Sequence, residues 1–174
     1  EAEDSFRAAI RLSPDLSEAW INLGLVRHKR GDVAEAEACY RHALHLGAPI
    51  AVVGGNLGLA LLEQGRPWEA EQACRLALEE APDDPAPRVN LAMTLLLTGR
   101  LREGWAAYEA RETVDPVPPP DAAAPALTNL RDARGRVVLV RAEQGFGDTL
   151  QFCRYVPLLA EAGATVLLEV PLAL

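Results

Sequence analysis

The feature that most constrains this chain is a repeat of 34 residues that runs through its first two thirds. The triplet Asn22-Leu23-Gly24 returns as Asn56-Leu57-Gly58 and again as Asn90-Leu91-Ala92. Agreement between several columns in one register predicts one structural unit per repeat. The other columns with the same step are Gly31, Gly65 and Gly99; Phe6, Tyr40, Cys74 and Tyr108; Ala2, Ala36, Ala70 and Gly104; and Pro14, Ala48, Pro82 and Pro116.

Each unit is predicted to contain two helices. In the first unit, one face of a helix is formed by the positions i, i+3, i+4 and i+7, which are Trp20, Leu23, Gly24 and Arg27. Gly31 supplies the left-handed residue that ends this helix, and a second helix runs from about Val33 to Leu46. Small residues let the paired helices approach closely, while aromatic residues fill the remaining gaps. The small residues are Gly24, Gly58, Ala92, Ala36, Ala70 and Gly104, and the aromatic ones are Trp20, Tyr40 and Tyr108.

This pattern resembles the tetratricopeptide repeat family, whose W-x-x-L-G, G, A, F, A and P positions are matched best by residues 17–50. The resemblance covers residues 1–116 as half a repeat followed by three full repeats, and we assign residues 1–114 to this domain. It departs from the family pattern where the Trp20 column becomes Gly54 and Arg88, and where Ala48 replaces a proline. The resemblance implies a right-handed α-solenoid whose first helices line a concave groove for an extended peptide.

The resemblance also indicates which residues would line the groove. Asparagine recurs in one column of the first helices, and its amide carries both a donor and an acceptor for a peptide backbone. The alternative is that these asparagines bond to a neighbouring repeat without any ligand. The predicted peptide-binding residues are Asn22, Asn56, Asn90, Leu25, Leu59, Met93 and Lys29.

Composition excludes several classes of function. The formal net charge of −8 and the pI of about 4.9 argue against a nucleic-acid partner, which needs a basic surface. No apolar run is long enough to span a bilayer, and no signal peptide is recognised, so a cytoplasmic location is expected. No metal site is expected, because Cys39 and Cys74 are predicted core residues and His42 with His45 lacks a third ligand. The acidic pairs Glu35 with Glu37 and Glu79 with Glu80 are predicted to be solvated.

Residues 115–134 are predicted to form a proline-rich linker. The segment opens with DPVPPPDAAAP, and this density of proline opposes helix formation and favours an extended backbone. A semi-rigid linker is favoured over a ligand for a proline-recognition domain.

Residues 135–174 are predicted to begin an α/β domain. The run from Val137 to Val140 is typical of a strand buried on both faces, residues 148–161 have a helical pattern, and residues 165–170 form a second strand. This order indicates a Rossmann-like βαβ unit with a parallel, right-handed crossover. The expected fold class is therefore mostly α: a solenoid followed by a partial α/β unit.

The loop EQGFGD, residues 143–148, lies where such folds place their ligands. It matches neither a dinucleotide fingerprint nor a P-loop. One interpretation is a capping box, in which Asp148 precedes the helix and Gln151 follows three residues later.

The other interpretation comes from a second resemblance. The last 40 or so residues are similar to the start of the glycosyltransferase domain of heptosyltransferase-like enzymes, and the whole chain resembles bacterial proteins that place tetratricopeptide repeats before such a domain. The resemblance implies that Asp148 is a general base for an acceptor hydroxyl and that Gly145 and Gly147 belong to an acceptor or phosphate loop. The nucleotide-sugar donor would bind a further domain of a longer parent, so this chain is expected to be inactive and without a cofactor.

Three functions are therefore open. The favoured one is a module that binds a protein or peptide segment, and the alternatives are a sugar transferase and a structural solenoid that self-associates. Two parallel strands cannot cover their own faces and leave open hydrogen-bonding edges. The α/β segment is accordingly expected to pair with another copy as a homo-oligomer.

Overall fold

The computed structural model describes residues 2–111, 127–142 and 146–170, with the side chains of residues 146–148 left out. Its contacts divide the chain into two compact units, Glu1–Pro116 and Val117–Leu174. Most of the predicted linker, together with Gly145, lies outside the described residues. Residues 130–133, which the sequence assigned to the linker, form a short 3₁₀ helix, η1 (Leu130–Ala133).

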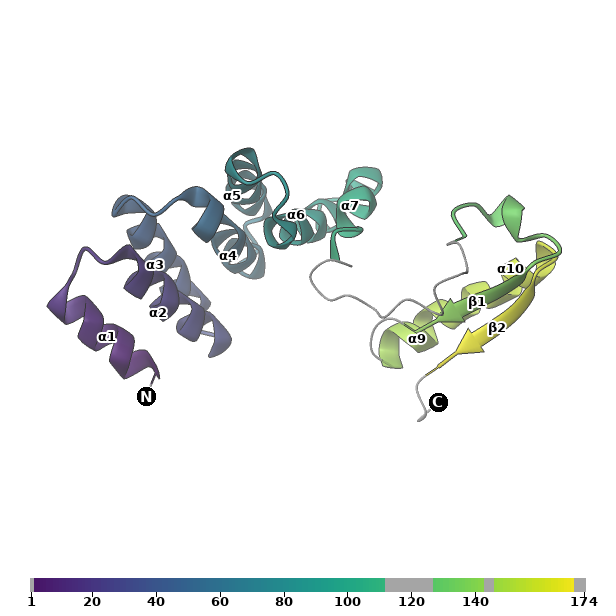
Figure 1. Cartoon of the computed structure of the whole chain (residues 1–174), viewed down its shortest axis with the longest axis horizontal. Helices are drawn as coiled ribbons and strands as arrows, with labels where there is room; N and C mark the ends of the chain where they lie inside the picture. The colour runs from purple at the N-terminus through teal and green to yellow at the C-terminus, as the bar shows by residue number, and fades with distance from the viewer. Residues whose placement is uncertain (1, 112–126, 143–145, 171–174) are drawn as a thin grey trace. The chain divides into compact units, whose positions relative to one another are not determined.

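The first unit consists of helices stacked in pairs, as the repeat predicts (Figure 1). Helix α1 (Ala2–Leu12) is the half repeat, and the three full repeats follow it. Each full repeat contributes a first helix and a second helix. These are α2 (Ser17–Lys29) with α3 (Val33–His45), α4 (Ile50–Glu63) with α5 (Pro67–Glu80), and α6 (Pro85–Leu97) with α7 (Leu101–Tyr108).

The glycine that follows each first helix has the predicted left-handed backbone. The φ angles of Gly31, Gly65 and Gly99 are 86°, 72° and 81°. A side chain at such a φ would be strained, so glycine lets the chain reverse into the second helix at the same point of every repeat.

The core of the repeats is formed by large residues packed against small ones, as predicted. Tyr40 is fully buried, and a Cβ added to Gly24 would lie 2.5 Å from its ring. In the next repeat Cys74 takes the place of Tyr40 and lies against Gly58, where an added Cβ would be 2.4 Å from its sulfur. Burial raises the pKa of both Tyr40 and Cys74 to about 12, so the thiol at position 74 is a core group and not a nucleophile.

The departures in the Trp20 column have structural explanations. The indole Nε1 of Trp20 donates to the carbonyl of Pro14 at 2.9 Å, and the Arg88 guanidinium donates to the equivalent carbonyl of Pro82. The residue type changes, but the bond that ties the loop to the first helix is kept. At Gly54 that bond is lost, and α4 approaches α5 closely instead: an added Cβ would lie 2.8 Å from the Ala73 carbonyl oxygen.

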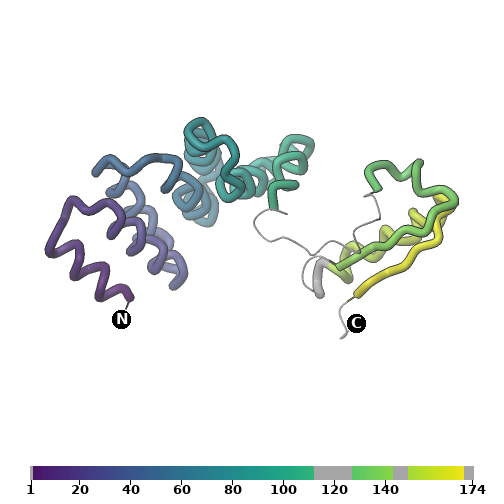
Figure 2. Tube along the Cα trace, in the orientation of Figure 1, coloured from purple at the N-terminus to yellow at the C-terminus, as the bar shows by residue number. Residues whose placement is uncertain are grey.

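The second unit is a parallel βαβ arrangement, as predicted. Strands β1 (Val137–Arg141) and β2 (Thr165–Glu169) run side by side in parallel, with Leu139 opposite Leu167 (Figure 2). The chain between them contains α9 (Phe146–Phe152), a 3₁₀ turn η2 (Cys153–Tyr155) and α10 (Val156–Glu161).

Two expectations for this unit are wrong. The single helix predicted over residues 148–161 is broken at η2, because Pro157 at the start of α10 has no N–H and its ring opposes a continuous helix. The strands are also not buried on both faces by the described residues. Val137 is 67% exposed and Leu167 53% exposed, whereas the opposite face, with Val138 and Val166, is partly covered.

Candidate functional site

The three first helices form one continuous surface of the repeat unit. In the described residues α2 touches α4 and α4 touches α6. His28 contacts Glu63, with Nε2 and Oε2 2.8 Å apart, and the Asn90 amide reaches the Gly55 carbonyl at 2.9 Å. Both contacts join a residue to the one 35 positions later, so the helices lie in register. Side chains of one column therefore form rows across the three helices.

We call this surface the first-helix face and define it by four rows. Residues four, three and four apart share one side of a helix, so the four columns face the same way. The rows are Glu18, Val52 and Ala86; Asn22, Asn56 and Asn90; Leu25, Leu59 and Met93; and Lys29, Glu63 and Leu97.

The predicted binding residues all retain some accessibility on this face. The three asparagines, Leu25, Leu59 and Met93 are partly buried, and Lys29 is exposed. Val52 is 56% exposed and Leu97 is 68% exposed. These two apolar side chains are therefore largely in contact with water.

The asparagine row divides into two kinds of residue. The Asn90 Nδ2 donates to the Gly55 carbonyl oxygen, which is the bond to a neighbouring repeat that the alternative interpretation expected. The backbone at Gly55 lies close to α6, since a Cβ added there would meet Pro87 at 3.4 Å, an ordinary contact distance. The side chains of Asn22 and Asn56 make no hydrogen bond to any described residue, so their amides keep donors and acceptors for another molecule.

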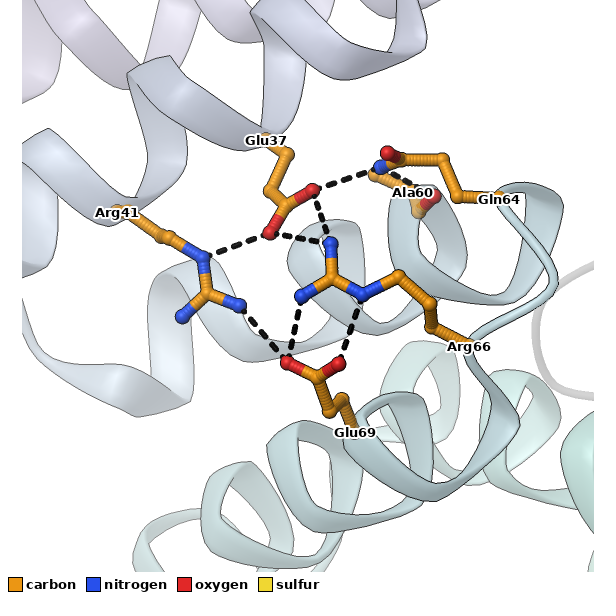
Figure 3. A network of polar contacts seen from close by, with 6 residues as sticks. All are labelled: Glu37, Arg41, Ala60, Gln64, Arg66 and Glu69. Atoms are coloured by element: carbon orange, nitrogen blue, oxygen red, sulfur yellow. Dashed lines mark hydrogen bonds and ion pairs between the residues drawn. The ribbon is translucent and has the colours of Figure 1, made fainter.

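A network of charges, which the sequence analysis missed, lies between the second helices. The Glu37 carboxylate of α3 accepts hydrogen bonds from Arg41 at 2.7 Å, Arg66 at 2.7 Å and Gln64 at 2.8 Å (Figure 3). Glu69 of α5 bridges the same two arginines, at 2.6 Å from Arg66 and 3.2 Å from Arg41. The network therefore ties the second repeat to the first.

The network recurs at the other two junctions. Glu71 accepts from Arg75 at 2.8 Å and Arg100 at 2.6 Å, and Glu3 pairs with Arg27 at 2.8 Å and also with Arg30. The side chains of Glu3, Glu37 and Glu71 occupy one repeat column, so the network repeats every 34 residues. We call these three residues, with their arginines, the glutamate ladder. Spacing of Glu four residues before Arg, repeated in Glu37–Arg41 and Glu71–Arg75, is the sequence pattern that would have revealed it.

The prediction that Glu37 belongs to a solvated face is wrong, because its residue is only 8% exposed. Burial by itself disfavours the carboxylate, but hydrogen bonds from Arg41, Gln64 and Arg66 outweigh it and lower the pKa of Glu37 below its ordinary value. Arg75 and Arg100 lower the pKa of Glu71 against the same opposing effect of burial. Glu37 and Glu71 are thus charged near neutral pH, and the ion pairs of the ladder join each repeat to the next.

The βα loop is only partly described. Gly147 and Asp148 belong to α9, which begins at Phe146, and Asp148 is its third residue. The capping box would need Asp148 to precede the helix, so that interpretation is wrong. Nothing in the described residues tests Asp148 as a general base or Gly147 as part of an acceptor loop, and Gly145 lies outside them.

Other candidate sites have ordinary structural explanations. The His42 ring lies against the Trp20 indole, with centroids 4.2 Å apart, and Cys39 and Cys74 are buried as predicted. Among the described residues no three metal-ligating side chains come together. None of the described helices has the length and apolar character needed to cross a bilayer.

Comparison with known proteins identifies the repeats. Family models described as tetratricopeptide repeat match residues 1–49 and residues 61–133. Of the solved structures, YrrB, described as a TPR protein with an unusual peptide-binding site, has 24% identity and a TM-score of 0.55 over 66% of this chain and 59% of its own. MamA has 18% identity and a TM-score of 0.58, with 66% and 67% covered. TTC0263, a thermophilic TPR protein in Thermus thermophilus, has 24% identity and a TM-score of 0.54, with 66% and 64% covered.

At these identities the likeness shows the fold alone, and the chain spans about three fifths to two thirds of the length of these proteins. No curated protein sequence matches the chain. Neither matching family model extends beyond residue 133, so both leave the βαβ unit uncovered.

Proposed function

We propose that this chain, which is a tetratricopeptide repeat protein, binds an extended peptide segment across its first-helix face. The observation that carries the proposal is the difference within the asparagine row. Asn90 is used between repeats, whereas the amides of Asn22 and Asn56 have no partner among the described residues. YrrB, a protein of this fold described as having a peptide-binding site, supports the same function.

The geometry of the face suits an extended backbone. Each free asparagine amide can donate to a peptide carbonyl and accept from a peptide N–H. Packed helices lie about 8–10 Å apart and an extended chain rises about 3.3 Å per residue, so a peptide of about five to seven residues would cross all three first helices. The two free asparagines, Asn22 and Asn56, would then meet the backbone about two to three residues apart.

The glutamate ladder, which joins the second helices, supports this function by holding the repeats in place. Its ion pairs join residues of different repeats, such as Arg66 to Glu37 and Arg100 to Glu71. They fix the rotation of one repeat against the next, and with it the spacing of the first helices. A row of groups held at fixed spacing loses little conformational entropy when a ligand binds.

The test compares Asn56→Ala with Asn90→Ala in binding to a peptide selected from a random library on the intact chain. Each net hydrogen bond contributes about 0.5–1.5 kcal/mol, so Asn56→Ala is expected to weaken binding by about twofold to tenfold. Asn90→Ala is expected to lower the unfolding midpoint and leave the intrinsic affinity of folded protein nearly unchanged. Equal effects of the two substitutions on affinity, or failure of the library to yield a specific peptide, would count against the proposal.

The second candidate function is sugar transfer. It is favoured by the parallel pairing of β1 and β2 and by the position of Asp148 in the first turn after β1, where α/β folds place reactive groups. In this proposal the Asp148 carboxylate takes the proton of an acceptor hydroxyl. Calorimetric titration of the chain and of Asp148→Asn with a nucleotide sugar and with candidate acceptors tests it, since acceptor binding should depend on position 148.

The proposed function includes self-association through the second unit. Val137, Leu139 and Leu167 lie on the open face of the two-stranded sheet and are 67%, 45% and 53% exposed. A parallel sheet is normally covered on both faces. A second copy of this unit packed against the open face would cover these side chains.

A further inference from the structure

We infer that the peptide bound on the first-helix face is an apolar one, with uncharged side chains where it crosses α4 and α6. The inference rests on the proposed function and specifies its ligand class. It is carried by the way in which charge and apolar surface are divided between the repeats.

The part of the face on α4 and α6 is apolar. Val52 and Leu97 are 56% and 68% exposed, and between them Leu59 and Met93 are partly buried in the third row. Ala86 completes the first row on α6. Methionine adapts its shape to irregular apolar partners, so Met93 suits a surface that takes leucine-like side chains. A ligand that covers these residues removes their apolar surface from water, and this makes binding more favourable.

The charged group on this part of the face already has a polar partner within hydrogen-bond distance. Glu63 is the acidic residue contributed by α4, and its Oε2 lies 2.8 Å from Nε2 of His28 on α2. The unpaired charges of the face, Glu18 and Lys29, both belong to α2 and have no ion-pair partner among the described residues. Charge selection by this face is therefore limited to the first repeat, and the other two repeats select for apolar side chains.

Acidic peptides suit this face poorly. Within the four rows, all of them described, Lys29 is the single unpaired cation, and the chain as a whole has a net charge of −8. The arginines that follow α4 and α6 in the chain are already paired in the glutamate ladder, where Arg66 binds Glu37 and Arg100 binds Glu71. A peptide carboxylate over α4 or α6 would lose water without gaining a cation, which is unfavourable.

Spacing defines the pattern of the ligand. Alternate side chains of an extended peptide point the same way and lie about 6.6 Å apart. Apolar residues at alternate positions would therefore face Leu59, Met93 and Leu97, while the backbone meets Asn56. The expected ligand has apolar side chains at every second residue over about six residues.

The experiment uses three fluorescein-labelled hexapeptides with blocked termini. One alternates leucine with serine, and the other two carry aspartate or lysine in place of leucine. Fluorescence anisotropy with the intact chain is expected to show at least tenfold tighter binding of the leucine peptide than of the aspartate peptide. Equal binding of the three, or tighter binding of the aspartate or lysine peptide, would overturn the inference.

Two matched substitutions locate the effect. Leu97→Ser removes an exposed leucine from the face, and Leu76→Ser removes one that is 49% exposed on the second helix α5. Burial of apolar surface stabilises a complex in proportion to the area covered, so Leu97→Ser is expected to weaken binding of the leucine peptide about fivefold or more. Leu76→Ser should leave it unchanged, and the reverse result would contradict the inference.

Asn56→Ala separates this inference from the proposed function. If Asn56→Ala weakens whichever peptide binds while leucine has no advantage, the first-helix face binds peptides and the apolar preference is wrong. If no hexapeptide binds and the random library yields none, both fail together. Circular dichroism of each variant shows that the helices are retained.

Discussion

At the scale of single residues, two adjacent glycines of α4 have different neighbours. A Cβ added to Gly54 would lie 2.8 Å from both the Ala73 carbonyl oxygen and the Ala77 Cβ, whereas one added to Gly55 would meet Pro87 at 3.4 Å. Both substitutions to alanine gain about 1 kcal/mol of helix propensity. We expect Gly54→Ala to lower the free energy of unfolding by about 1–3 kcal/mol, because overpacking against backbone outweighs that gain.

Gly55→Ala is the matched control, with the same change one residue away. It is expected to leave the free energy of unfolding unchanged or raise it by up to about 1 kcal/mol. Urea denaturation followed by circular dichroism measures both. A Gly54→Ala variant as stable as Gly55→Ala would mean that α4 and α5 do not pack as closely as the structure shows.

Tyr40 provides a second prediction at this scale. Its ring is fully buried against Gly24, but its hydroxyl has no hydrogen-bond partner in the part of the chain that the structure describes. An unsatisfied buried hydroxyl costs about 1–3 kcal/mol. Tyr40→Phe keeps the ring and removes that cost, so a higher thermal midpoint is expected. A marked loss of stability would show instead that the hydroxyl has a partner, such as a buried water.

Residue types alone predicted the core well and the binding row less well. Gly24 and Tyr40 belong to repeat columns of fixed size, so their contact followed from the sequence. Asn90 and Asn56 are the same residue in the same column, yet only Asn90 has Gly55 opposite it. Whether an asparagine bonds to the neighbouring repeat depends on how closely two helices approach. The residue types of one repeat column do not reveal that distance.

At the scale of helices and strands, the glutamate ladder should control how repeats stack. Glu37→Gln keeps the shape of the side chain but removes the charge that Arg41 and Arg66 share. Hydrogen bonds to charged groups contribute about 1.5–3 kcal/mol, so a loss of about 1–3 kcal/mol in the free energy of unfolding is expected at pH 7. Glu35→Gln, on the exposed side of the same helix, is the control and should change it by less than about 0.5 kcal/mol.

The ladder also predicts a pH dependence. The pKa values of Glu37 and Glu71 are lowered in the folded chain, so their contribution is complete above the ordinary value of 4.5 and is lost as the pH falls through that value toward the folded ones. The stability gap between wild type and Glu37→Gln should therefore be constant from pH 7 to about pH 5.5 and shrink below it. Urea titrations at pH 7, 5 and 4 measure the gap, and a gap that widens in acid would contradict the ladder.

Element boundaries were predictable where one residue decides them. Gly31 and its equivalents end the first helices as expected, because a left-handed backbone strongly favours glycine. The break at η2 was missed although Pro157 was visible, since the apolar spacing of residues 148–161 suits one continuous helix. The missing N–H of proline, not the apolar pattern, decides the outcome there.

At the scale of the whole molecule, the sequence predicted two kinds of structure and the described residues contain both. The repeat unit was predictable because its information is periodic, with each helix pair packed against its neighbours in sequence. The exposure of one sheet face in the second unit was not predictable from the sequence. The apolar strands suggested burial on both faces, but none of the described residues of that unit packs on the open face. Val137 and Leu167 were correctly placed in strands, but not in the buried environment that their apolar run suggested.

Self-association of the second unit is the prediction that belongs to this scale. Leaving a leucine in water forgoes about 1.5–3 kcal/mol of burial, and Leu139 and Leu167 are adjacent across the two strands on the open face. We expect size exclusion with light scattering at micromolar concentration to show a dimer or larger species. Leu167→Glu should shift it to a monomer, because a charge on the open face cannot be buried without a partner. Leu12→Glu changes a leucine that is 85% exposed on α1 and should leave the mass unchanged. A monomeric wild-type chain, or equal effects of the two substitutions, would contradict self-association through the open face.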